Sequence, residues 1–226
     1  MDLIEQYLRE LKSLFWENNM VPDEYQIERL ANYAQLVIQK NEAINLISRK
    51  DTEHIIENHV FMSALVTNFI SEKAMRYLDI GTGGGFPGIP IAILRPLLRG
   101  VLADSTGKKI DAVSEFIKKL KLSNVKAVND RVESNEFIEK YKESFELFVS
   151  RATVPVIVLV RYALPLMKEK AKILALKGGD VDEEIRTAEI KYKSKIKKAT
   201  VVDLKYKPNN TRNEKDKKLI ILELMK

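Results

Sequence analysis

Cysteine is absent from the 226-residue chain, and histidine occurs only twice. The absence of thiols excludes disulfides, thiolate metal sites and cysteine nucleophiles. His54 and His59 are five residues apart, which places them roughly 140° apart around a helix, so they cannot bind one metal from the same face. No metal site is therefore expected.

Long hydrophobic runs are also missing. No segment approaches the roughly 18 uninterrupted apolar residues of a membrane span, and Asp2 and Glu5 interrupt the region where a secretory signal would be apolar. A cytoplasmic protein without a membrane partner is therefore expected. Because 45% of the residues are hydrophobic, the chain has enough apolar side chains for one substantial core with a smaller appendage.

Apolar side chains at helical spacing indicate that residues 1–70 are this appendage, a helical extension packed on the core formed by residues 71–226. Three stripes carry the prediction: Ile4, Leu8, Leu11, Leu14 and Phe15; Ile27, Leu30, Ala34, Val37 and Ile38; and Ile55, Val60, Ala64 and Leu65.

Glycine is scarce, yet five of the nine glycines lie between positions 81 and 88. A short apolar strand over 77–80 is expected to lead into this turn, and a helix over 89–94 to follow it. Glycines supply positive φ and leave no Cβ between backbone N–H groups and a ligand. The turn therefore predicts a nucleotide-type cofactor at the end of the strand.

Two cofactor patterns fit the same turn. Gly83, Gly85 and Gly88 form the G-x-G-x-x-G fingerprint of dinucleotide-binding proteins. Asp79 followed by glycines at 81, 83 and 85 forms the acidic-x-G-x-G-x-G pattern usual in S-adenosylmethionine (SAM) methyltransferases. The next strand, 101–104, ends in Asp104, roughly 20 residues after the turn, where a carboxylate can accept both ribose hydroxyls. The alternative for both aspartates is that they cap helices.

The end of the chain favours the methyltransferase pattern. Strands over 125–129, 145–150 and 172–176 alternate with helices over 108–121, 134–141 and 156–168, as in a doubly wound parallel α/β sheet. The last two predicted strands, 199–204 and 218–225, are joined by a polar loop too short for a crossover helix, so they must be antiparallel. A mostly parallel, seven-stranded sheet with a reversed last strand is the SAM-methyltransferase arrangement.

Residues 79–90 read DIGTGGGFPGIP, and this string resembles the signature of the RsmG/GidB family. Further matches lie in family order from near residue 45 to residue 178, on both sides of this string, and include Asn45, Asp51, His59, Asp104, Arg131, Ser150, Arg151, Ala175 and Lys177. Met62 stands where the family usually has Asp, so the role of that acid does not transfer to this chain.

The resemblance implies SAM-dependent methylation of guanine N7 in 16S ribosomal RNA. The implied partner is 16S rRNA or a small-subunit assembly intermediate, and a monomer is expected. The residues expected to bind SAM are Asp79, Gly81, Gly83, Gly85, Phe86, Asp104, Ser105, Thr106, Val132, Glu133 and Arg151. Guanine N7 carries a free lone pair, so its methylation requires no general base, and none is identified.

The net charge of +6 and the isoelectric point near 9.2 suit a polyanionic partner. Lys108 and Lys109 follow the second strand, while Arg151 and Lys177 follow later strands at the edge where open α/β sheets bind ligands. These four residues are the candidates for RNA contact. The lysines at 191–198 fit a solvated face equally well. Two other functions stay open: an NAD-dependent oxidoreductase, and a non-catalytic RNA-binding module that retains SAM.

Overall fold

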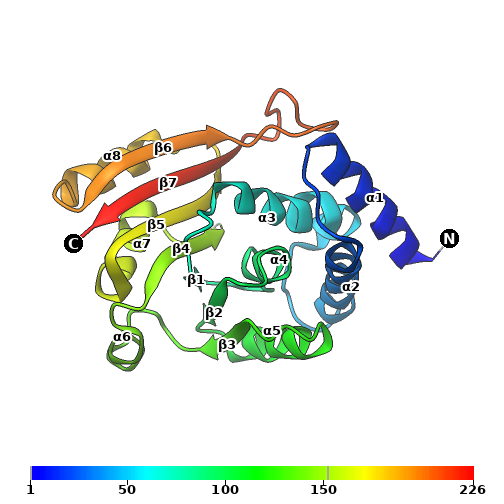
Figure 1. The fold of residues 1–226 in the computed structure, drawn as a ribbon, viewed down its shortest axis with the longest axis horizontal. Helices are drawn as coiled ribbons and strands as arrows, with labels where there is room; N and C mark the ends of the chain where they lie inside the picture. Colours follow the sequence, from blue (N-terminus) through cyan, green and yellow to red (C-terminus); the bar gives the residue numbers. More distant parts are fainter. Residues whose placement is uncertain (1, 152) are drawn as a thin grey trace.

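The protein, described by a computed structural model over residues 2–151 and 153–226, is built around a seven-stranded sheet (Figure 1). The strand order is β3-β2-β1-β4-β5-β7-β6. The strands are β1 (Arg76–Ile80), β2 (Arg99–Asp104), β3 (Val125–Asn129), β4 (Phe145–Arg151), β5 (Met167–Gly178), β6 (Ile196–Asp203) and β7 (Lys217–Met225).

Strand direction in the sheet agrees with the prediction. Strands β1 to β5 pair in parallel, whereas β7 is antiparallel to both of its neighbours, β5 and β6. The chain runs outward from β1 through β2 to β3 and then returns to the other side of β1 with β4. This reversal creates a crevice at the carboxyl ends of β1 and β4, where ligands bind in such folds.

Helices cover both faces of the sheet because its inner strands carry apolar side chains on both sides. Helices α4 (Gly88–Leu94) and α5 (Gly107–Lys119) lie on one face, and α6 (Asn135–Tyr141), α7 (Val156–Leu166) and α8 (Asp182–Lys191) lie on the other (Figure 1). Neighbouring residues of β1 separate accordingly: Tyr77 belongs to the first hydrophobic cluster and Leu78 to the second.

The N-terminal extension packs on the α4–α5 face. It contains α1 (Leu3–Glu17) and α2 (Glu24–Asn41), followed by the short turns η1 (Arg49–His54), η2 (Ile56–Phe61), α3 (Met62–Leu65) and η3 (Val66–Phe69). The apolar stripes of α1 and α2 are buried in one cluster with the sheet. The third stripe is also buried, but it runs through the π turn η2 and the short α turn α3 instead of one regular helix.

Two predicted boundaries in the second half of the sheet are wrong. Helix α7 ends at Leu166 and β5 begins at Met167, five residues before the predicted strand. The first half of β5 carries lysines at 168, 170 and 172, so the apolar run that identifies a strand begins only at Ile173. Helix α8, between β5 and β6, was not predicted. No helix in the described part of the chain is long and apolar enough to span a membrane.

Candidate active site

The glycine turn after β1 needs glycine at three positions for different reasons. Gly81, Gly83 and Gly85 all have positive φ, at 69°, 57° and 99°. A Cβ on Gly81 would lie 2.6 Å from Cγ2 of Thr153, and one on Gly85 would lie 2.7 Å from Cδ1 of Ile89. A Cβ on Gly83 would meet no atom within 4 Å. Of the three, only Gly83 has open space where a Cβ would project.

Asp79 lies beneath this turn and caps α4. Its Oδ2 accepts hydrogen bonds from the Thr82 hydroxyl at 2.7 Å and from the backbone N–H of Gly88, the first residue of α4, at 2.9 Å. Its Oδ1 is buried and has no hydrogen-bond partner among the described residues. Burial raises the pKa of this carboxyl to about 7. The capping alternative for Asp79 thus describes its contacts, and a direct cofactor contact stays a prediction.

Asp104, at the end of β2, links the turn to the next helix. Oδ2 accepts from the Gly83 N–H at 3.0 Å, and Oδ1 accepts from the Thr106 N–H at the start of α5 at 2.9 Å. The carboxylate is only partly buried. Since two oxygens offer about four acceptor positions, Asp104 retains capacity for a ligand beyond these two bonds.

A pocket of about 230 Å³ opens at this point, at the carboxyl ends of β1 and β2. Five of the residues predicted to bind a cofactor line it together: Gly81, Asp104, Ser105, Val132 and Glu133. Phe86, by contrast, is buried, with only 2% of its surface exposed. Its ring lies under the turn, against Tyr33. We refer to the pocket of about 230 Å³ as the Asp104 pocket.

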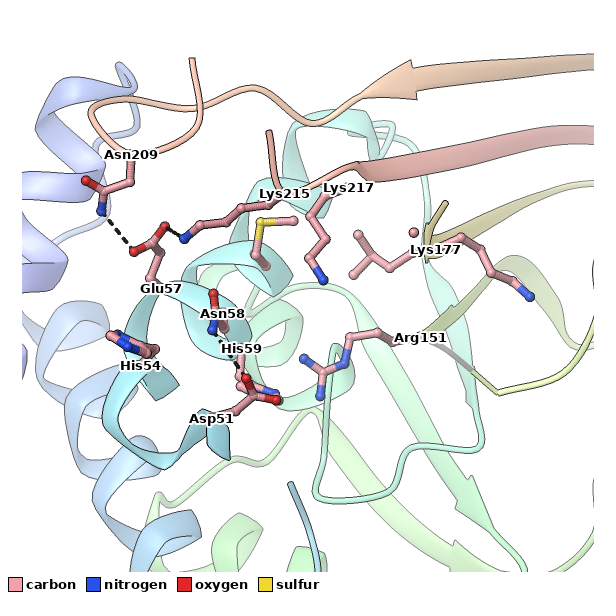
Figure 2. Close-up of a pocket in the computed structure, with 13 residues that line it drawn as sticks. Asp51, His54, Glu57, Asn58, His59, Arg151, Lys177, Asn209, Lys215 and Lys217 are labelled. Carbon is pink, nitrogen blue, oxygen red and sulfur yellow. Dashed lines mark hydrogen bonds and ion pairs between the residues drawn. The ribbon is translucent and has the colours of Figure 1, made fainter. Parts of the chain in front are cut away.

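A second and larger pocket, of about 660 Å³, is lined by Arg151 at the end of β4 (Figure 2). The guanidinium carbon lies 4.7 Å from the centroid of the Phe86 ring. Desolvation lowers the pKa of Arg151 to about 10, so the side chain stays protonated at neutral pH. Thr153 and Val154, just after β4, line the Asp104 pocket. Arg151 therefore belongs to the segment that separates the two pockets, and we call the larger one the Arg151 pocket.

The predicted lysines differ in what they contact. Lys177 lines the Arg151 pocket, but its ammonium points away from the space (Figure 2) and donates to the Val154 carbonyl and to Glu184, each at 2.9 Å. Lys108 is exposed and Lys109 partly exposed on the first turn of α5, without an ion pair among the described residues. The RNA contacts expected of Lys108, Lys109 and Lys177 stay predictions.

His59 is buried at the wall of the Arg151 pocket. Its ring centroid lies 5.3 Å from that of Phe86, and neither ring nitrogen has a hydrogen-bond partner in the described part of the chain. Its Nε2 lies 3.6 Å from Oδ2 of Asp51. Burial and the nearby charge of Arg151 lower the pKa of His59 to about 3, so the imidazole is neutral at physiological pH. Met62, one turn further, is also buried and lines the same pocket.

Several residues of the Arg151 pocket were not predicted. Glu57 accepts hydrogen bonds from Tyr206 at 2.7 Å and Asn209 at 2.9 Å, and it pairs with Lys215. Burial alone would raise the pKa of Glu57, but these donors outweigh it and lower the value. These partners lie about 150 positions after Glu57 in the chain (149 for Tyr206), so no local sequence pattern predicts the contacts. Asp51, His54, Asn58 and Lys217 complete the polar lining.

Comparison with known proteins agrees with this geometry. The family model described as GidB, rRNA small subunit methyltransferase G, matches residues 26–213. Two curated relatives carry the name ribosomal RNA small subunit methyltransferase G. The protein from Chlorobium chlorochromatii is 41% identical over 78% of this chain and 74% of its own length. The one from Chlorobium limicola is 44% identical over 73% of each chain.

Among solved structures, an O-methyltransferase from Bacillus cereus in complex with SAH shares the fold. Its TM-score is 0.60 at 19% identity, over 99% of this chain and 100% of that chain. The family match covers the glycine turn, strands β1 to β5 with the residues that they contribute to the two pockets, and most of the N-terminal extension. By this match, and by the identity to its curated relatives, the chain belongs to the rRNA small subunit methyltransferase G family.

Proposed function

We propose that this methyltransferase transfers the methyl group of SAM to N7 of a guanine in 16S rRNA. The observation that carries the proposal is the pair of adjoining pockets at the carboxyl edge of the sheet, with the protonated Arg151 on the segment between them. One pocket suits an adenosine-containing cofactor, and the other is large enough for a nucleobase. The substrate is either naked 16S rRNA or a small-subunit assembly intermediate.

The residues of the Asp104 pocket fit SAM. Gly83, which donates its N–H to Asp104 beside the pocket, leaves open space where a side chain would project. Asp104 keeps acceptor capacity suited to ribose hydroxyls. Ser105 would flank the adenine, and Val132 and Glu133 would contact its edge. SAM, when bound, supplies an electrophilic methyl group on a sulfonium. The dinucleotide alternative is not favoured, because the family is one of methyltransferases.

Guanine N7 is a suitable methyl acceptor because it carries a lone pair and no hydrogen, so the enzyme removes no proton from it. As the bond from N7 to the methyl carbon forms and the bond from carbon to sulfur breaks, the positive charge passes from sulfur to the base. The protein's task is to align the base and exclude water. His59, whose pKa of about 3 leaves it neutral, is not required as a base in this scheme.

Arg151 would orient the guanine. A single hydrogen bond from its guanidinium to O6 leaves the N7 lone pair free, whereas a bidentate contact to O6 and N7 would block the reaction. Stacking of Arg151 on Phe86 restricts the directions in which the guanidinium can donate. This restriction supports the single contact.

The product identifies the reacting atom. N7-methylguanine is cationic, so borohydride and aniline should cleave treated RNA at one site, and only when both enzyme and SAM were present. Incorporation of labelled methyl without cleavage would place the methyl group on a carbon or exocyclic nitrogen instead. No incorporation into 16S rRNA or small-subunit particles would favour the non-catalytic alternative. Mass spectrometry of 16S rRNA from cells lacking the protein would test the same assignment in vivo.

A further inference from the structure

Two oppositely charged side chains face each other across the Arg151 pocket without forming an ion pair. Figure 2 shows Asp51 of η1 and Arg151 of β4 pointing into the same space. Neither an ion pair nor a hydrogen bond joins them in the described part of the chain, although the negative charge of Asp51 partly offsets the fall in the pKa of Arg151. The space between them is therefore bounded by a donor group and an acceptor group.

Asp51 is the carboxylate of this pocket with free acceptor positions. Its side chain is 40% exposed, and it receives one long hydrogen bond, 3.4 Å, from the Asn58 amide. His59 lies 3.6 Å away without a hydrogen bond. The other carboxylate, Glu57, is occupied by three donors. A ligand that offers N–H groups to this wall would thus meet Asp51.

We propose that Asp51 accepts the N1–H and 2-amino hydrogens of the target guanine while Arg151 donates to O6. The inference rests on the proposed function and assigns base selection to a residue outside the glycine turn. On guanine the O6 acceptor, the N1–H donor and the 2-amino donor follow one another along a single edge. Adenine presents an amino group and a ring-nitrogen acceptor along that edge, so it would put a donor against Arg151 and a lone pair against Asp51.

The same orientation directs N7 toward the cofactor. On guanine, N7 lies on the opposite side of O6 from N1. If Asp51 holds N1 and Arg151 holds O6, N7 faces the side of Arg151 away from Asp51. The residues that follow Arg151 in the chain, Thr153 and Val154, line the Asp104 pocket. One arrangement of the base thus accounts for both selection of guanine and exposure of its reactive atom.

Inosine in place of the target guanosine tests the contact. Inosine keeps O6, N1–H and N7 and lacks only the 2-amino group. With wild-type enzyme, inosine at the target position should lower kcat/KM by about tenfold or more, because a hydrogen-bonding group is left unpaired. With Asp51→Asn, kcat/KM for RNA with guanosine at the target position should fall to a similar level. Replacing that guanosine by inosine should then lower kcat/KM little further. Binding of the two RNAs to the enzyme loaded with S-adenosylhomocysteine should show the same pattern.

Two variants provide controls. Glu53→Gln removes an exposed carboxylate from the same short helix and should leave the preference for guanosine unchanged. Lys217→Ala removes an ammonium that points into the pocket (Figure 2). This change should weaken the binding of the guanosine and inosine RNAs equally, as expected for a phosphate contact.

Equal rates for guanosine and inosine with the wild-type enzyme would overturn the inference, and that measurement requires no variant. An inosine penalty as large in Asp51→Asn as in the wild type would also overturn it. A wild-type enzyme that does not methylate guanosine N7 would instead refute the proposed function, so the two failures are distinguishable.

Discussion

Arg151 stacks on Phe86, with 4.7 Å between the guanidinium carbon and the ring centroid, and this contact connects the two pockets of the site. Phe86 ends the glycine turn that borders the Asp104 pocket, while Arg151 lines the larger one. A cation over an aromatic face is attracted to it, more strongly where water is excluded. The arginine is therefore held in one orientation before any base enters.

Arg151→Ala should reduce turnover far more than it reduces affinity for SAM. Loss of a hydrogen bond from a charged donor costs roughly 1.5–3 kcal/mol, about a 10- to 150-fold fall in kcat/KM. Arg151→Lys should recover little, because an ammonium lacks the planar geometry that stacks on Phe86. Calorimetry with SAM beside single-turnover kinetics provides the test. Equal losses in SAM affinity and activity would assign Arg151 to the cofactor site.

Gly83→Val should abolish SAM binding while the protein still folds. No atom lies within 4 Å of the position where the side chain would begin, so the branched group would project into open space next to Asp104, which accepts from the Gly83 N–H. The positive φ of 57° adds a cost of about 1–2 kcal/mol in stability. Gly85→Ala is the matched control, because its Cβ would collide with Ile89 beneath the turn. That variant should lower the melting temperature more than Gly83→Val does. Retained SAM binding in Gly83→Val would show that the cofactor lies elsewhere.

Asp79→Asn should change how stability depends on pH. The folded-state pKa of Asp79, about 7, is raised above its usual 3.8 by burial, so the folded state binds more protons than the unfolded state between these values. Stability contributed by Asp79 is therefore full below about pH 4 and falls as pH rises toward 7, with a slope of at most about 1.4 kcal/mol per pH unit. His59, with its folded pKa lowered to about 3, contributes the opposite slope between about 3 and 6.5.

Urea unfolding of cofactor-free protein at several pH values measures this effect. In Asp79→Asn the opposing contribution of His59 remains, so stability should rise more steeply from pH 4 to 6.5 than in the wild type. The amide oxygen of Asn can still accept from Gly88, which preserves the cap of α4. Parallel profiles for the two proteins would mean that Asp79 does not change its proton occupancy on folding over this range.

Glu57→Gln should release the loop between β6 and β7. Glu57 binds this loop through Tyr206, Asn209 and Lys215. Loss of its charge should cost roughly 1–3 kcal/mol of folding stability and expose the loop to trypsin after Arg212 or Lys215. Glu53→Gln, at an exposed position, should change stability by no more than about 0.5 kcal/mol. Unchanged trypsin cleavage in Glu57→Gln would show that other contacts suffice to hold the loop.

What the sequence predicts correctly is local to the ends of strands. Asp104 and Gly83 are recognisable because each has a fixed place relative to an apolar strand, and the parallel sheet then brings them into contact. Their binding of SAM stays a prediction. The resemblance to the RsmG/GidB family is likewise confirmed by the family match. The reversed β7 follows from the short connection before it.

What the sequence does not reveal depends on pairing between side chains of different segments. Lys177 was predicted to contact substrate, yet its ammonium pairs with Glu184, which lies on the unpredicted helix α8. The wall of the Arg151 pocket is similar, since Glu57 and Lys215 are 158 positions apart. Each pair joins residues of two different segments, so the residue pattern of a single strand or helix does not reveal it.

The rate of methyl transfer in single-turnover experiments should vary little between about pH 6 and 9. N7 attack removes no proton from the base, and the groups nearest to it hold one charge state over this range: Arg151 has a pKa of about 10 and His59 of about 3. Asp79 is the exception, with a pKa of about 7 beneath the glycine turn. A modest inflection near pH 7 that disappears in Asp79→Asn would therefore report the charge of Asp79 and not proton transfer. A tenfold rise with a single pKa that persists in that variant would require a general base, and the proposed mechanism would then be wrong.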